Sequence, residues 1–62
     1  MKFYVSLQGK DTPGLGYFVI VNAPCHETCV AKLESHGFHN WSTIYRNQRI
    51  VLRSNLKLWE EI

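Results

Sequence analysis

The side chains of this 62-residue chain that best suit metal binding or nucleophilic chemistry are two cysteines and three histidines. Thiolates and imidazoles are the ligands that zinc prefers, and the set comprises Cys25, His26, Cys29, His36 and His39. The eleven helical steps from Cys25 to His36 span about 16 Å along a helix axis, whereas a tetrahedral site holds every ligand within about 2.3 Å of one ion. Cys25 and Cys29 could supply half a site at most. We therefore expect small buried thiols and surface histidines, with no metal.

Cys25 is also the candidate nucleophile, because it falls in the first turn of an expected helix, where the dipole and unpaired N–H groups favour a thiolate. Cys29 could then act as a resolving thiol. His26 is badly placed as a general base, since adjacent helical residues do not face each other. The glycines at positions 9, 14 and 16 lead into a strand and lack the Gly-Lys-Ser/Thr sequence of a phosphate loop. We expect neither an enzyme nor a bound cofactor.

A third group of residues combines arginines with aromatic side chains. Aromatic residues on a sheet rimmed by arginines stack bases and hold phosphates in several RNA-binding domains, and arginine and tryptophan are equally favoured in protein hot spots. The Lys/Arg-Gly-Phe/Tyr-Gly/Ala-Phe signature of the RNA-binding class is missing, and a net charge of +2 falls short of a dedicated nucleic-acid binder. The candidate partner-binding residues are Tyr4, Trp41, Tyr45, Arg46, Arg49, Arg53 and Trp59.

We expect these side chains to be positioned by a single domain over residues 1–62. A domain of this size buries only about 60% of its unfolded surface and gains roughly 3–5 kcal/mol from its core, so additional support such as a partner is expected. Two cysteines are too few for a secreted disulfide scaffold. The chain shows neither a signal-peptide h-region nor the roughly 20 apolar residues of a membrane span. We therefore expect a cytoplasmic protein without a membrane partner.

The first part of the chain predicts two antiparallel strands. Residues 2–8 alternate between apolar and polar side chains, and residues 15–21 are apolar at nearly every position. The turn formers of residues 9–14 lie between them. The next segment, residues 24–36, predicts a helix, because Pro24 suits a first turn and Gly37 suits the position just past a last turn.

The second part of the chain is less well marked. Residues 41–45 predict a third strand, Asn47 and Gln48 a tight turn, and residues 49–53 a fourth strand. The C-terminal segment, residues 55–62, allows two interpretations. Asn55 could cap a short helix, whereas Leu56, Leu58 and Glu60 would alternate in a strand. We favour the short C-terminal helix.

These elements predict an α+β fold, in which three or four antiparallel strands in the order 2-1-3-4 carry one helix on one face (ββαββ). The opposite face would be open without being plainly polar. A contiguous apolar patch on so small a domain marks an interface. Three covers for that face stay open: a partner, a second copy in a homodimer, or the C-terminal segment folded across it with Trp59, Leu56 and Leu58.

The strand–strand–helix–strand layout of residues 2–45, which begins with a phenylalanine-containing strand, resembles small early proteins of bacteriophages that bind and disable host machinery. The similarity is to the layout of a phage inhibitor of host RNA polymerase and extends to no specific motif. It implies a protein-surface blocker or adaptor in the host cytoplasm. A DNA mimic would be strongly acidic, which this chain is not.

Residues and resemblance together predict a small non-enzymatic protein-binding module that modulates or inhibits a host protein complex. The alternative is a small RNA- or single-stranded-DNA-binding domain that uses the aromatic and arginine face. Salt separates the two predictions, because affinity for nucleic acid falls steeply as salt rises.

Overall fold

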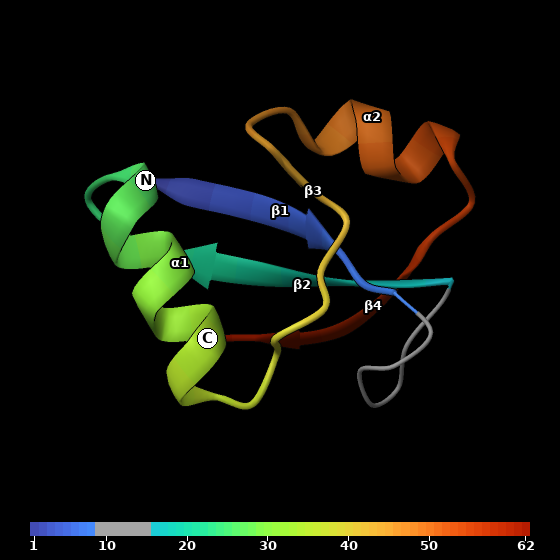
Figure 1. The fold of residues 1–62 in the computed structure, drawn as a ribbon. Coiled ribbons are helices and arrows are strands. Elements are labelled where there is room, and N and C mark those ends of the chain that lie inside the picture. Colours follow the sequence, from blue (N-terminus) through green and yellow to red (C-terminus); the bar gives the residue numbers. More distant parts are fainter. Residues whose placement is uncertain (9–15) are drawn as a thin grey trace.

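The computed structural model of the chain describes residues 1–8 and 16–62. Its elements, in chain order, are β1 (Lys2–Ser6), β2 (Tyr17–Asn22), α1 (His26–Ser35), β3 (Thr43–Tyr45), α2 (Gln48–Arg53) and β4 (Lys57–Glu61) (Figure 1). This order, ββαβαβ, confirms the α+β class but adds a second helix. The turn predicted over residues 9–14 lies outside the described residues.

The four strands form one mixed sheet in the order β3-β1-β2-β4. β1 pairs antiparallel with both β2 and β3, as predicted, so that Phe3 lies opposite Val21 and Val5 opposite Val19. β4 pairs parallel with β2 at the far edge. The prediction of a purely antiparallel sheet in the order 2-1-3-4 is therefore wrong. In the structure, α2 connects the third strand to the fourth. A helical connection of this kind joins parallel strands, whereas the predicted hairpin would join antiparallel ones.

α1 begins later than predicted and ends where predicted. Cys25 is its N-cap, with extended backbone (φ −156°, ψ 171°), so Pro24 precedes the helix and does not form its first turn. At the other end Gly37 is left-handed (φ +88°). The N–H of Phe38 donates to the Leu33 carbonyl at 2.9 Å, and both side chains are buried in the same core. This is the glycine-terminated helix end that the sequence indicates.

Residues 49–53 form a helix, so the predicted fourth strand and the predicted tight turn before it are both wrong. Asn47 is the N-cap of α2, and its side-chain oxygen accepts the backbone N–H of Arg49 at 2.9 Å. In a strand, Arg49, Val51 and Arg53 would share one face, which would bury two cations with the valine. In a helix, Val51 points away from both arginines, so it is fully buried while they remain exposed.

Asn55 ends α2 and does not start a further helix. Its backbone is left-handed (φ +57°), and the N–H of Leu56 donates to the Val51 carbonyl at 3.3 Å. The chain then runs into β4, so the short C-terminal helix is wrong and the alternative strand interpretation is right. β4 contains an irregularity opposite Phe18 and Val19 that leaves Trp59 without a paired residue.

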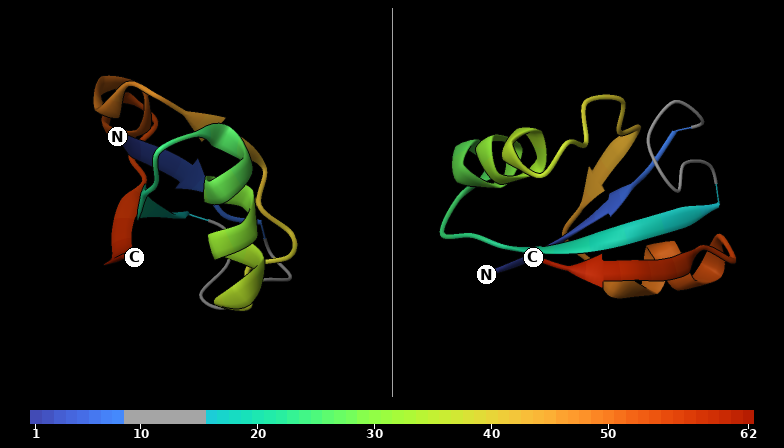
Figure 2. Two further views of the ribbon diagram at one scale, coloured as in Figure 1. Left: turned by 90° about the vertical axis from the view of Figure 1, so that its left-hand side faces the viewer. Right: turned by 90° about the horizontal axis from the view of Figure 1, so that it is seen from below.

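The two helices cover opposite faces of the sheet (Figure 2). The α1 side carries the larger core, which consists of Phe3, Val5, Leu7, Val19, Val21, Ala23, Cys29, Leu33 and Phe38. On the α2 side Phe18, Ile20 and Val51 form a smaller core, against which Tyr4, Tyr45 and Leu56 pack. The prediction of one helix and an open second face is therefore wrong. The apolar excess of β2 is explained by burial from both sides.

Candidate functional site

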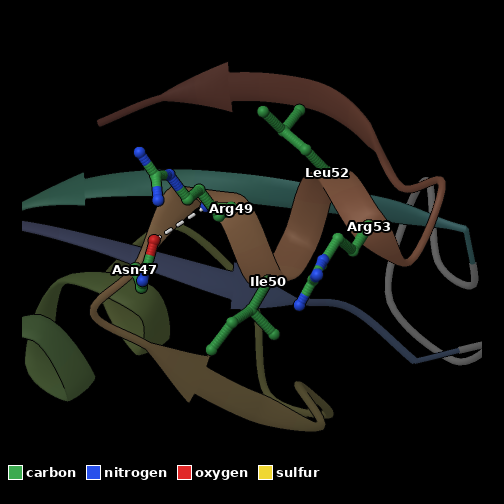
Figure 3. Close-up of a pocket in the computed structure, with 5 residues that line it drawn as sticks. All are labelled: Asn47, Arg49, Ile50, Leu52 and Arg53. Atoms are coloured by element: carbon green, nitrogen blue, oxygen red, sulfur yellow. Dashed lines mark hydrogen bonds between the residues drawn. The ribbon is translucent and has the colours of Figure 1, made fainter.

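The outward side of α2 presents a hollow with charged and apolar walls. The hollow has a volume of about 550 Å³ and is lined by Asn47, Arg49, Ile50, Leu52 and Arg53 (Figure 3). We call these five residues the α2 surface. Ile50 and Leu52 are 42% and 56% exposed, although both are large aliphatic side chains. Their exposure follows from the helical periodicity, because burial of Val51 turns its two neighbours to the flanks of the helix.

The cations of the α2 surface have no partner among the described residues. Arg49 and Arg53 are four residues apart, so their side chains lie one helical turn from each other. Within residues 1–8 and 16–62, neither guanidinium has an ion pair or a hydrogen-bond acceptor, and the ion pair formed there joins Lys2 to Glu61 at 3.4 Å. The described part of the chain therefore uses none of the donors of either guanidinium.

Arg46, the third arginine of the predicted site, is engaged elsewhere. Its guanidinium carbon lies 5.6 Å from the centroid of the Phe3 ring, in a cation–π contact. One of its nitrogens also donates to the sulfur of Met1 at 3.0 Å. Phe3 belongs to the core under α1, so Arg46 lies on the other side of the sheet from Arg49 and Arg53. Arg46 therefore makes contacts within the fold and is not part of the α2 surface.

The predicted tyrosines lie beneath the α2 surface. Tyr4 and Tyr45 are directly opposite each other on β1 and β3. Both are half-buried against the core that contains Val51, and the Tyr4 ring centroid lies 6.5 Å from that of Phe18. They support α2 from below and do not form an open aromatic platform.

The predicted tryptophans lie on the α1 side. Trp41 is half-buried against the larger core. Trp59 is 47% exposed, and its ring meets that of Tyr17 edge-on, with centroids 5.8 Å apart. The structure thus brings together Tyr4, Tyr45, Arg49 and Arg53 on one side of the sheet. Trp41, Arg46 and Trp59 lie on the other.

Sequence reasoning did not select the aliphatic residues Ile50, Leu52 and Leu58 for the site. Leu58 is 51% exposed on β4 and pairs with Phe18, so its side chain lies on the α2 side of the sheet. The side chain of Leu52 extends from α2 toward β4 (Figure 3). The signal that could have identified Ile50 and Leu52 is the pair of asparagines at 47 and 55. Both are good helix-terminus residues, and they enclose a segment of helical length.

The two cysteines differ in environment. Cys29 is fully buried, and burial raises the pKa of its thiol. The exposed Cys25 sulfur lies 3.3 Å from the Thr28 hydroxyl, and hydrogen bonds from that hydroxyl and from the Thr28 backbone N–H lower the pKa of the Cys25 thiol. His26 turns its ring edge-on to Phe3. Across the described residues, no three His, Cys, Asp or Glu side chains gather closely enough to hold a metal ion.

Neither described helix is long and apolar enough to cross a membrane. Comparisons of the chain with protein-family models, with curated proteins and with solved structures find no match. The molecule is thus a small α+β domain whose second helix presents a basic and apolar surface. We infer its function from the chemistry of that surface.

Proposed function

We propose that this chain is a small non-enzymatic protein-binding module and that the α2 surface is where it contacts its partner. The observation that carries the proposal is the exposure of Ile50 and Leu52, 42% and 56%, on the two flanks of one short helix. Burial of apolar surface is worth about 25 cal/mol per Å². A partner that covers these side chains gains that free energy, and Leu58 on β4 enlarges the area available to it.

Three contacts fix the backbone of α2, and this rigidity favours binding. The Asn47 cap fixes the start of α2, the Ser54 hydroxyl donates to the Ile50 carbonyl at 3.0 Å, and Val51 is anchored with no exposed surface. A six-residue helix would not persist by itself. Because the fold already holds it, a partner does not have to order it on binding.

The partner class follows from the charge and from the layout. The similarity of residues 2–45 to the layout of phage inhibitors supports a protein of a host complex as the target, bound in the host cytoplasm. The α2 surface is basic and aliphatic. It suits a protein surface that offers carboxylates and apolar side chains, and bound to its target the module would act as a blocker or an adaptor.

Nucleic-acid binding is the second candidate, and it is favoured by the guanidiniums of Arg49 and Arg53, which no residue in the described part of the chain pairs. Single-stranded nucleic acids also need aromatic side chains on which bases stack. On this side of the sheet the aromatic residues are Phe18, which is buried, and Tyr4 and Tyr45, which are half-buried beneath α2. Ile50 and Leu52 supply aliphatic contacts in their place. The protein partner is therefore the better match.

The test is capture from a bacterial lysate with the tagged full chain, with and without nuclease. The double variant Ile50→Ser/Leu52→Ser removes the apolar part of the α2 surface, and Trp59→Ser removes an exposed apolar side chain from the other side of the sheet. We expect a stoichiometric protein that survives nuclease, is lost with the double variant and is retained by Trp59→Ser. Circular dichroism checks that both variants are folded.

Two results contradict the proposal. A protein captured equally well by the Ile50→Ser/Leu52→Ser variant would mean that the interface lies elsewhere. Capture that disappears with nuclease, or that falls steeply as salt is raised, would transfer the function to nucleic acid.

A further inference from the structure

We infer that the partner segment bound by the α2 surface is acidic and amphipathic, with carboxylates that engage Arg49 and Arg53 and an apolar side chain that enters the hollow beside Ile50 and Leu52. This inference rests on the proposed function and names the chemistry of the partner.

The arginine pair supplies the first reason. A guanidinium is a planar fork of donors that matches a carboxylate with two parallel hydrogen bonds. Arg49 and Arg53 lie one helical turn apart, and within residues 1–8 and 16–62 nothing neutralises either charge. Two like charges at this spacing repel each other. A partner that brings two carboxylates at a similar spacing removes the repulsion and forms two charge-assisted contacts.

The apolar walls supply the second reason, and they separate a peptide from a nucleic acid. Figure 3 shows Leu52 on the flank of α2 that faces β4 and Ile50 on the opposite flank, so the two aliphatic side chains border the arginine pair from either side. The hollow of about 550 Å³ is largely open to solvent, so a partner segment can reach it from outside. Aliphatic walls offer no stacking surface to a base. They do bury a leucine, methionine or phenylalanine.

The charge distribution supplies the third reason. A nucleic-acid backbone is bound by a line of cations along its path. Here Arg46 is stacked on Phe3 on the far side of the sheet, so that two arginines remain on the α2 surface. The net charge of the whole chain is +2. Two carboxylates fit this arrangement better than a chain of phosphates.

The test is an in vitro selection of binders from a random peptide library displayed on their own messenger RNA, with the folded full chain as bait. We expect the enriched peptides to carry paired Asp or Glu residues around an apolar residue. The best peptide is then titrated into ¹⁵N-labelled protein. Its Glu→Gln version should bind about tenfold more weakly, and the arginine side-chain signals of Arg49 and Arg53 should shift on binding.

A charge-matched pair of protein variants provides the control. Arg49→Gln/Arg53→Gln should weaken binding of the acidic peptide about tenfold. Arg46→Gln/Lys57→Gln also removes two positive charges, but away from α2, and should preserve binding. Enrichment of neutral peptides, no enrichment at all, or equal loss with both double variants would overturn the inference. Tighter, Arg49- and Arg53-dependent binding of a short oligothymidylate would also overturn it, in favour of nucleic acid.

The two proposals fail in different ways. If a lysate protein is captured through Ile50 and Leu52 but selection yields neutral peptides, the binding module stands and the acidic partner is wrong. If acidic peptides bind at Arg49 and Arg53 but no lysate protein is captured through Ile50 and Leu52, the surface chemistry stands and the proposed function is wrong.

Discussion

Gly37 and Asn55 end the two helices of this protein with the same backbone geometry. Both residues are left-handed, with φ of +88° and +57°. The residue after each donates its N–H to a carbonyl five positions earlier, Phe38 to Leu33 at 2.9 Å and Leu56 to Val51 at 3.3 Å. In both cases the donor and acceptor residues belong to one apolar cluster. The chain therefore leaves each helix in a fixed direction, which sets where β3 and β4 begin.

The helix ends predict different effects for a matched pair of substitutions, a loss of stability at Gly37 and none at Asn55. Gly37→Ala should lower the free energy of unfolding by about 1–2 kcal/mol, because an alanine is strained in left-handed backbone. The new Cβ would meet no atom within 4 Å, so the loss comes from the backbone alone. Asn55→Gly should not lower stability, since glycine accepts this conformation. Urea unfolding measures both. A neutral Gly37→Ala would contradict the role of this helix end.

Val51 anchors α2 to the sheet, so its truncation should be costly. It has no exposed surface and packs with Phe18 and Ile20. Val51→Ala should lower the free energy of unfolding by about 2 kcal/mol, through lost apolar burial and a residual cavity. Ile50→Ala, one position along the same helix and 42% exposed, should change it by less than about 0.5 kcal/mol. Equal effects of the two substitutions would mean that α2 is not seated as described.

The C-terminal strand should loosen at acid pH because of Glu61. The Asn22 amide, which donates to the Glu61 carboxylate at 2.8 Å, and Lys2, 3.4 Å away, lower the pKa of this carboxyl. A lowered folded-state pKa contributes stability that is present above the unfolded pKa, ordinarily about 4.3, and is lost as pH falls through the folded value.

The variant Glu61→Gln isolates that contribution. It should be less stable than the natural chain at pH 7, and the difference should shrink as pH falls below about 4. Urea midpoints at a series of pH values provide the measurement, because Gln keeps the shape of the side chain and does not titrate. A stability difference between the two chains that stays constant down to pH 2 would contradict the assignment.

The cysteines should differ in their reactivity. Cys25 is exposed and its pKa is lowered through Thr28, whereas Cys29 is buried and its pKa is raised. Iodoacetamide at neutral pH should therefore alkylate Cys25 first, and Thr28→Val should slow the reaction by removing the hydroxyl. Mass spectrometry of the native protein follows both sites. Faster alkylation of Cys29 would show that α1 opens readily.

Much of the first half of this fold can be predicted locally. The alternation of Phe3, Val5 and Leu7 predicts β1, because a strand with one buried face requires period two. The continuously apolar run of residues 15–21 predicts a strand, and the structure gives the reason for its composition, which is burial under a helix on each side. Gly37 marked the end of α1, since left-handed backbone suits glycine.

The second half could not be predicted in this way, because Ile50, Val51 and Leu52 form a short apolar run that fits a strand or a helix equally well. The choice depends on partners distant in sequence. Phe18 and Ile20 form a surface that accepts one apolar side chain from above, and Val51 supplies it when the segment is helical. The strand conformation of residues 57–61 likewise depends on a distant partner, because β4 pairs with the edge of β2.

The sequence by itself determined the types of residue at the candidate site, arginines together with large apolar side chains, and it placed most of them near the C-terminus. Only the tertiary structure decided which of them share a surface. With residues 49–53 as a helix, Arg49 and Arg53 lie on the side opposite Val51. With Tyr4 and Tyr45 seated under that helix, the aromatic face becomes core. The physical reason is that a side chain's direction follows from the backbone period, and the period of a short segment is set by what it packs against.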